Sequence, residues 1–250
     1  MSFLENMKIN TALILAGGRG TRFKEQTETI PKPMIKANGI PLLVYIINHY
    51  KTYGVNEFFI LMGYKQNIIK EYFDGSREYT LVNEDYICDD GSKVVLLDTG
   101  EETLTGGRLK IALEAHQLEN FYLTYGDGIS DVDISKLTEF HMQNGLIGTV
   151  TAVNPPPRFG LLEIEDDFVT KVREKNEIIP SWINGGFFVL NKRICNYLIK
   201  DEPFEDTPLS KLSKDQQLSA YKHTGYWQCV DTIRELEILE SDIENKKYKI

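Results

Sequence analysis

Strand-length apolar runs alternate with helical segments through the first half of this chain. The predicted strands there are 11–15, 57–62, 93–97 and 121–125, and the predicted helices are 41–50, 66–73, 108–116 and 134–144. Such alternation predicts a parallel sheet that is covered by helices on both faces. Ligands of these sheets bind beyond the carboxyl ends of the strands. The turns that follow residues 15 and 125 are therefore expected to face one cleft.

The second half, after residue 146, has a different pattern of short β-rich segments. The strands predicted there are 148–153, 160–164, 169–174, 185–190, 218–221 and 226–230, with a helix starting at 206–208 and a terminal helix over 232–246. No low-complexity linker separates the two halves, and no internal repeat is apparent. We therefore expect a single α/β domain over residues 1–250.

Charge and composition exclude several classes of function. The formal net charge is −9, whereas a protein that coats nucleic acid needs clustered Lys and Arg, so no nucleic-acid partner is expected. No apolar run of about 18 residues is present, which predicts no membrane span. The first residues lack the apolar core of a signal peptide, and Cys88, Cys195 and Cys229 match no zinc or disulfide spacing. We expect a cytoplasmic protein with reduced, structural cysteines.

A glycine-rich turn, Ala16-Gly-Gly-Arg-Gly-Thr-Arg22, follows the first predicted strand directly. Glycines let backbone amides approach a ligand closely, and two cations stand nearby, Arg22 at the end of the turn and Lys32 between two prolines. This combination favours polyphosphate binding over a plain flexible turn. The spacings of the P-loop and of the dinucleotide fingerprint are both missing, which disfavours a redox dehydrogenase.

Two carboxylates are candidate metal ligands. Asp127 follows a predicted strand in Thr124-Tyr-Gly-Asp-Gly128, and Asp231 precedes the terminal helix. Mg²⁺ in proteins is commonly held by one or two carboxylates together with substrate phosphates. Taken alone, Asp127 also fits an ordinary Asp-Gly turn and Asp231 also fits a helix N-cap, so both alternatives stay open.

Two further segments combine polar side chains with strand ends. Glu174-Lys175 ends a predicted strand and fits either a ligand contact or a charged surface run. Asn184-Gly-Gly186 precedes an apolar strand and fits either close approach to a small ligand or a hairpin turn.

Over about residues 8–240 these motifs together resemble the sugar-1-phosphate nucleotidylyltransferase family, most closely its glucose-1-phosphate cytidylyltransferase branch. The glycine-rich turn is typical of the whole superfamily. Three segments point to the cytidylyl branch: Thr105-Gly-Gly-Arg108, Thr124-Tyr-Gly-Asp-Gly128 and Asn184-Gly-Gly-Phe-Phe188.

The resemblance implies an α/β Rossmann-like nucleotidyltransferase fold with a mostly parallel central sheet and a β-rich, sugar-binding second half. It implies a nucleotide-binding half at about 8–146, a sugar-phosphate-binding half at about 147–231, and a C-terminal helix and tail at 232–250. It also implies that CTP and a sugar 1-phosphate, best α-D-glucose 1-phosphate, react with Mg²⁺ to give a CDP-sugar for a surface polysaccharide, and pyrophosphate. A homo-oligomer is expected.

The same resemblance assigns roles by position. The implied nucleotide-binding residues are Leu15, Ala16, Gly17, Gly18, Gly20, Thr21, Arg22, Gly107, Arg108 and Asp127. The implied substrate-binding residues are Lys32, Tyr125, Glu174, Lys175, Asn184 and Trp227. Catalysis is assigned to Lys32, Arg22 and Asp127, and Mg²⁺ to Asp127 and Asp231.

Alternatives to this activity remain. The same chemistry could use UTP or dTTP, or another phosphorylated acceptor, since Asn176 replaces the proline usual after Glu-Lys in this family. A non-catalytic regulatory homologue that binds nucleotide sugars would keep the same fold. Retention of Lys32, Asp127 and Asp231 favours an enzyme.

Overall fold

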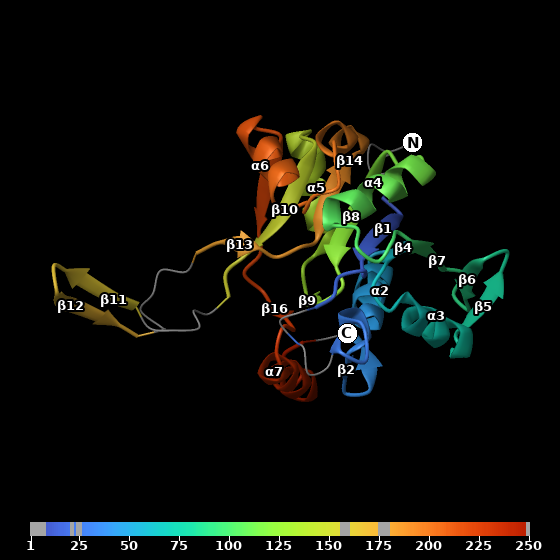
Figure 1. The fold of residues 1–250 in the computed structure, drawn as a ribbon, viewed down its shortest axis with the longest axis horizontal. Coiled ribbons are helices and arrows are strands. Elements are labelled where there is room, and N and C mark those ends of the chain that lie inside the picture. Colours follow the sequence, from blue (N-terminus) through green and yellow to red (C-terminus); the bar gives the residue numbers. More distant parts are fainter. Residues whose placement is uncertain (1–8, 21–22, 24–26, 156–160, 175–180, 249–250) are drawn as a thin grey trace.

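A computed structural model describes residues 9–20, 23, 27–155, 161–174 and 181–248. Its centre is a ten-stranded sheet in the order β13-β10-β14-β8-β1-β4-β7-β6-β5, with β15 also paired to β10 (Figure 1). Four central strands run parallel: β8 (Asn120–Tyr125), β1 (Thr11–Leu15), β4 (Glu57–Met62) and β7 (Lys93–Asp98). The expected α/β fold with a parallel core is thereby confirmed.

The flanks of the sheet are mixed. On one side lie β14 (Phe188–Asn191), β10 (Gly148–Val153), β13 (Ile183–Asn184) and β15 (Leu218–Lys222), and on the other the hairpin of β5 (Tyr79–Val82) and β6 (Asp85–Cys88). Strand β14 is antiparallel to β8, and β10 is antiparallel to β14, whereas β15 runs parallel to β10. The β-rich second half thus extends the same sheet.

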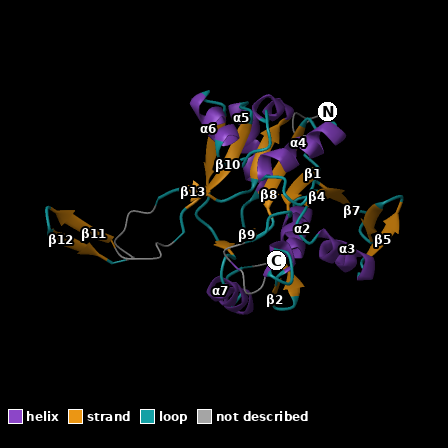
Figure 2. Cartoon of the chain, in the orientation of Figure 1, coloured by secondary structure: helices purple, strands orange, loops and turns teal. Residues whose placement is uncertain are grey.

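Helices cover both faces of the sheet (Figures 1 and 2). They are α2 (Leu42–Thr52), α3 (Gln66–Gly75), α4 (Thr105–Ala115), α5 (Ile134–Asn144) and α6 (Thr207–Lys214). Helix α7 (Ile233–Glu244) lies away from the sheet, beside the short strands at 36–37 and 227–229. The apolar run of β1 after Thr11 is buried on both sides: Ala12 and Ile14 belong to the core that contains α2, and Leu13 and Leu15 belong to the core on the α4 side. Successive side chains of a strand point to opposite faces, so a strand buried on both faces needs apolar residues throughout.

Small elements complete the structure near the edge where the parallel strands end. They are the helical turn η3 (Lys32–Met34) and the strand pairs β2 (Lys36–Ala37) with β3 (Ile40–Pro41) and β9 (Gly128–Ser130) with β16 (Trp227–Cys229). The helical turn η5 (Lys192–Tyr197) follows β14 at the opposite edge, where β8 begins. No helix among the described residues is long and apolar enough to cross a membrane.

The antiparallel strands β11 (Leu161–Glu165) and β12 (Phe168–Arg173) form a hairpin that stands away from the sheet (Figures 1 and 2). We call residues 161–173 the projecting hairpin. Its exposed apolar side chains are Leu162, Ile164, Phe168, Val169 and Val172.

Three segments differ from the sequence-based expectation. Helix α4 begins at Thr105, three residues before the predicted start, because Gly106 and Gly107 are helical rather than part of a loop. The predicted strand 185–190 begins only at Phe188, as β14, since Gly186 and Phe187 both have positive φ, and the short strand β13 precedes the predicted range. The β5–β6 hairpin has no counterpart in the predicted strands.

Candidate active site

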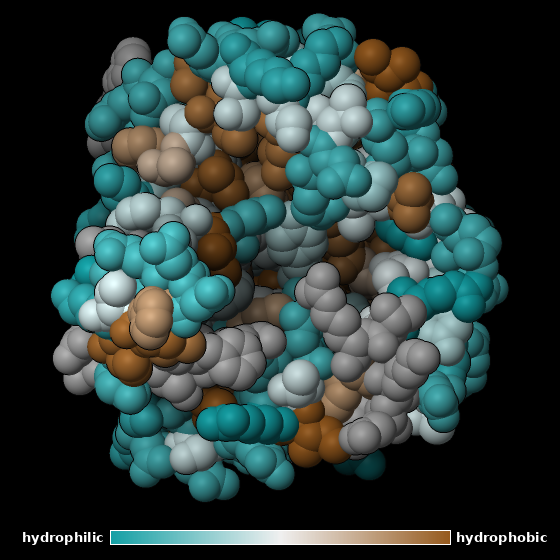
Figure 3. Space-filling view, turned by 60° about the vertical axis from the view of Figure 1, so that its left-hand side comes forward, coloured by the Kyte–Doolittle hydropathy of each residue, from teal (hydrophilic) through white to brown (hydrophobic). Residues whose placement is uncertain are grey.

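A cleft of about 450 Å³ opens at the carboxyl ends of β1 and β8, where the sequence predicts a ligand site. Its lining contains these predicted site residues: Leu15, Ala16, Gly17, Gly18, Gly20, Lys32, Arg108, Tyr125, Asp127 and Asp231. A hollow with apolar side chains inside and polar ones around it is visible in Figure 3. The cleft therefore collects residues from five separate segments of the chain.

Tight packing at the ends of β1 and β8 brings Lys32 to the cleft. Leu15 and Tyr125 are register partners, and the Gly126 amide donates a hydrogen bond to the Leu15 carbonyl at 3.0 Å. A Cβ on Gly126 would lie 2.6 Å from Pro33 Cγ, so only glycine lets η3 pack this closely. Pro33 thereby holds its neighbour Lys32 over the strand ends.

The side chain of Lys32 lies between two carboxylates. Its Nζ is 2.5 Å from Asp127 Oδ2 and 2.5 Å from Asp231 Oδ1, and the residue is only 8% exposed. Burial opposes its charge, but the attraction of Asp127 and the hydrogen bonds to both carboxylates outweigh burial and raise the pKa of Lys32. The ammonium group is therefore fully protonated at neutral pH.

The pairing of β9 with β16 brings Asp231 to Asp127. Gly128 pairs with Cys229, and the Val230 amide donates to the Asp127 carbonyl at 3.1 Å. Thr232, not Asp231, is the N-cap of α7, because its side chain accepts a hydrogen bond from the Glu235 amide. The carboxylate of Asp231 is thus available to the cleft.

These two carboxylates form a donor set that suits a hard divalent cation. They converge on one positive charge, the ammonium of Lys32, from two different elements. Carboxylate oxygens arranged in this way are the ligands that Mg²⁺ prefers. The residues present therefore fit a hard divalent cation.

Arg108 lies beneath the glycine-rich turn and is only 2% exposed. Its guanidinium donates to the carbonyls of Gly17 at 2.9 Å and Met62 at 2.8 Å, and to Thr99 Oγ1 at 2.7 Å. Burial lowers the pKa of Arg108, and only the more distant charges of acidic residues oppose this. A Cβ on Gly17 would lie 2.2 Å from the guanidinium carbon, so Gly17 makes room for this contact. Arg108 thus ties the turn to β4, and its contact with a nucleotide base stays a prediction.

Tyr125, which lines the cleft, is connected to the segment that begins at Asn184, and Trp227 contacts the same segment. The Asn184 amide donates to Tyr125 Oη at 3.0 Å, and the Trp227 indole donates to the Gly185 carbonyl at 2.9 Å. Burial is the main reason why the pKa of Tyr125 is raised, and nearby Glu205 raises it further, so the phenol stays neutral. The Asn184-Gly-Gly segment therefore borders the cleft at Tyr125.

Other predicted residues lie elsewhere. Glu174 is exposed just after β12 of the projecting hairpin and is not part of the cleft lining. Gly107 is buried in α4, where an added Cβ would lie 2.1 Å from Asp201 Oδ1. Thr21, Arg22 and Lys175 fall outside the described residues.

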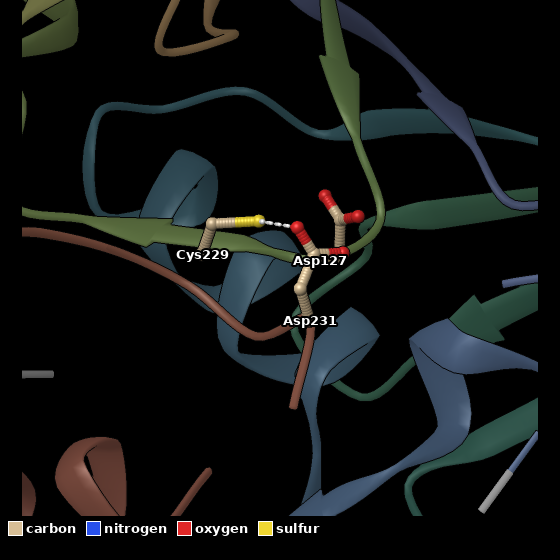
Figure 4. A group of neighbouring side chains, drawn as sticks. All are labelled: Asp127, Cys229 and Asp231. Carbon is tan, nitrogen blue, oxygen red and sulfur yellow. Dashed lines mark hydrogen bonds between the residues drawn. The ribbon is translucent and has the colours of Figure 1, made fainter. Parts of the chain in front are cut away.

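Cys229 is a member of the site that the sequence analysis treated as structural only. Its Sγ lies 3.8 Å from Asp231 Oδ2, and the two side chains and Asp127 point toward one another (Figure 4). Burial raises the pKa of the Cys229 thiol, and the charge of Asp127 raises it further. Its position two residues before Asp231 is the signal that could have identified it, because residues so close in sequence lie near each other in the fold.

Comparison with known proteins places the chain among enzymes with the expected fold. A family model described as "Nucleotidyl transferase" matches residues 11–246. The probable glucose-1-phosphate cytidylyltransferase of Bacillus subtilis is 40% identical over 239 residues, which cover 90% of this chain and 92% of that one. The glucose-1-phosphate cytidylyltransferase of Salmonella typhimurium is 39% identical over 251 residues, 94% of this chain and 96% of that one.

A solved structure agrees with these matches. The crystal structure of HddC from Yersinia pseudotuberculosis complexed with GMP-PN superposes with a TM-score of 0.70 at 26% identity. The alignment covers 94% of this chain and 100% of HddC. The architecture and the family expected from the sequence are both confirmed.

Proposed function

The chain belongs to the nucleotidyl transferase family, and we propose that it joins CTP to a sugar 1-phosphate, giving a CDP-sugar and pyrophosphate. The preferred acceptor in this proposal is α-D-glucose 1-phosphate. Its main support is the placement of Lys32 against Asp127 and Asp231 at the mouth of the glycine-rich turn. The names of the two bacterial relatives support the choice of cytosine and glucose.

The proposed reaction is an in-line attack by a phosphate oxygen of the acceptor on the α-phosphorus of CTP. A phosphate monoester is already ionised at neutral pH, so the protein needs no general base for this step. It must instead align two anionic reactants and offset their repulsion. Lys32, buried and protonated, is the group proposed to stabilise charge on the α-phosphate.

Asp127 and Asp231 are proposed to hold Mg²⁺, which when bound would neutralise charge on the triphosphate. The carboxylates would then exchange the Lys32 ammonium for the metal, leaving Lys32 free to bind phosphate. Gly17, Gly18 and Gly20 are proposed to bind the triphosphate through their backbone, together with Thr21 and Arg22. Gly107 and Arg108 remain the proposed neighbours of the base.

The acceptor is proposed to lie against Tyr125, Asn184 and Trp227. Their mutual contacts beside the cleft support this assignment. Glu174 and Lys175 are proposed to bind the sugar hydroxyls and the sugar phosphate. Because Glu174 is exposed beside the projecting hairpin, its proposed role is the one that the geometry supports least.

The experiment that tests the proposal is a measurement of pyrophosphate release with Mg²⁺. CTP, UTP, dTTP, ATP and GTP are each combined with a panel of sugar 1-phosphates and a few non-sugar phosphates. We expect release with CTP and glucose 1-phosphate. Release with CTP and a different acceptor would keep the chemistry and reassign the residues around Asn184. No release with any pair, in folded protein that still binds CTP, would favour a regulatory homologue.

We also propose that the chain forms a homo-oligomer in the cytoplasm. The exposed apolar side chains of the projecting hairpin support assembly, because soluble monomers rarely expose large apolar patches. The free thiols of Cys88, Cys195 and Cys229 support a reducing compartment. Light scattering tests whether the chain forms an oligomer, and a monomer at every protein concentration would contradict that proposal.

A further inference from the structure

The cluster of Asp127, Asp231 and Cys229 offers a donor that a magnesium site does not need. One ligand atom from each residue lies within 4.8 Å of the other two, and the sulfur and both carboxylates face one another (Figure 4). Mg²⁺ takes oxygen ligands in near-octahedral geometry and makes little use of sulfur. A thiol at this place therefore changes which metals the site can accept.

The spacing suits a smaller, thiophilic cation. Zinc bonds are about 2.3 Å to sulfur and about 2.1 Å to oxygen, so a tetrahedral site separates these donors by about 3.6 Å. The observed separation of Cys229 Sγ from Asp231 Oδ2 is 3.8 Å. All three side chains are partly buried, which limits competition from water. Three protein donors with one position open to the cleft match the arrangement of many zinc sites.

We propose that Asp127, Asp231 and Cys229 bind a thiophilic divalent cation such as Zn²⁺ or Cd²⁺ in the absence of nucleotide. Formation of the metal–sulfur bond releases the thiol proton to solvent, as deprotonation of ligands by a bound metal requires. The cation takes the place of the Lys32 ammonium between the two carboxylates. The cleft then holds a thiolate-bound metal where the transferase reaction needs an exchangeable Mg²⁺.

Lys32 acts as the competitor of this cation within the chain. Its Nζ contacts both carboxylates at 2.5 Å, so the metal must displace a charge that is already well placed. Removing this ammonium is expected to raise affinity for the thiophilic metal. Lys32→Leu removes the charge and adds no sulfur or oxygen donor of its own.

The proposal concerns the site of the proposed function, but its test needs neither nucleotide nor acceptor. Cd²⁺ alone is titrated into the full chain while the ultraviolet thiolate-to-cadmium charge-transfer band is recorded. The wild type is expected to develop the band up to one equivalent of metal, and Cys229→Ser is expected to lose it. Calorimetry should give an affinity for Cd²⁺ at least about tenfold lower in Cys229→Ser, since sulfur is the donor that selects soft metals.

Cys195→Ser is the matched control, because Cys195 is free and exposed. It is expected to keep the band, and Lys32→Leu is expected to bind Cd²⁺ at least about tenfold more tightly, as removal of a competing charge implies. Circular dichroism confirms that each variant is folded. A band that persists in folded Cys229→Ser, that disappears in Cys195→Ser, or that is absent from the wild type would overturn the proposal. Failure of the transferase reaction would leave this result unaffected.

Discussion

The body of the molecule buries charged groups, whereas the projecting hairpin exposes apolar ones. Lys32 and Arg108 are 8% and 2% exposed in the body, while Phe168 of the hairpin is 77% exposed. Both of these cations donate hydrogen bonds to acceptors from distant segments of the chain. Buried charges persist when they are paired, and exposed apolar patches mark surfaces that contact something else. The body is thus organised around the candidate site, whereas the projecting hairpin exposes an apolar surface.

The largest expected effect is on the charged groups of the cleft. We expect Lys32→Ala and Asp127→Asn each to lower turnover by at least about a hundredfold, or about 3 kcal/mol, because each removes stabilisation of developing charge. Turnover is measured as pyrophosphate release by folded protein. Lys36→Ala, which removes an exposed lysine of β2 close in sequence, is the matched control and should stay within about twofold of wild type. Near-normal turnover in either cleft variant would remove that residue from the mechanism.

Arg108→Met tests whether the buried guanidinium stabilises the body. We expect a loss of about 2–3 kcal/mol in the free energy of unfolding, because the carbonyls of Gly17 and Met62 lose their charged donor. Lys110→Met changes a partly exposed cation on the same helix and should cost less than about 0.5 kcal/mol. Both values come from urea unfolding. Equal values for the two variants would show that burial of Arg108 does not matter to stability.

His141 makes the body sensitive to acid. It is buried on α5 and hydrogen-bonded to Thr149 Oγ1 at 2.8 Å; burial, with a smaller effect of Arg193, lowers the pKa of His141 to about 4. An unfolded histidine titrates near 6.5. Between these two values the unfolded state binds more protons than the folded state. The contribution of neutral His141 to stability is therefore fully present above about pH 6.5 and is lost as the pH falls toward about 4.

From about pH 7 to about pH 5 this one group is expected to remove about 2 kcal/mol from the free energy of unfolding. His141→Gln keeps a polar partner for Thr149 but cannot titrate, so its stability should fall by about 2 kcal/mol less over the same range. Urea unfolding of both proteins at the two pH values measures the difference. Parallel pH dependence in wild type and variant would contradict the assignment.

The parts of the fold that local patterns determine could be predicted from the sequence. Strands β1 and β4 were found because burial on both faces requires unbroken apolar runs. The start of α4 was missed because Gly106 and Gly107 read as a loop, although an added Cβ on Gly106 would lie 2.5 Å from the Glu202 carbonyl. That close approach comes from a segment far along the chain and leaves no local pattern.

Some residues of the candidate site could be predicted from the sequence, and others could not. Lys32, Asp127 and Asp231 could be chosen from motifs, and the fold brings all three to one cleft. Cys229 was missed because its nearness to Asp127 depends on the pairing of β9 with β16. The acceptors of Arg108 could not be predicted either, since they lie on three separate segments of the chain. Roles in binding the substrates stay predictions.

The projecting hairpin should show the smallest effect on the stability of the chain itself. Val172 is opposite Leu162 on an exposed face, whereas Val189 of β14 is fully buried in the body. We expect Val172→Thr to change the free energy of unfolding by less than about 0.5 kcal/mol. The same change, Val189→Thr, should cost at least about 1 kcal/mol because it buries a hydroxyl. Both are measured by urea unfolding at a concentration where light scattering gives a monomer.

A double variant of the hairpin, compared with Val189→Thr, separates folding from assembly. If the hairpin contacts a second copy of the chain, the double variant Leu162→Thr with Val172→Thr should lower the average mass at high protein concentration while leaving the monomer folded. Val189→Thr should weaken the monomer without a selective effect on mass. A large loss of monomer stability in the hairpin variants would mean that its apolar face is already covered within one chain. The contrast between the two regions would then fail at the hairpin, and the proposed oligomer would lose its support.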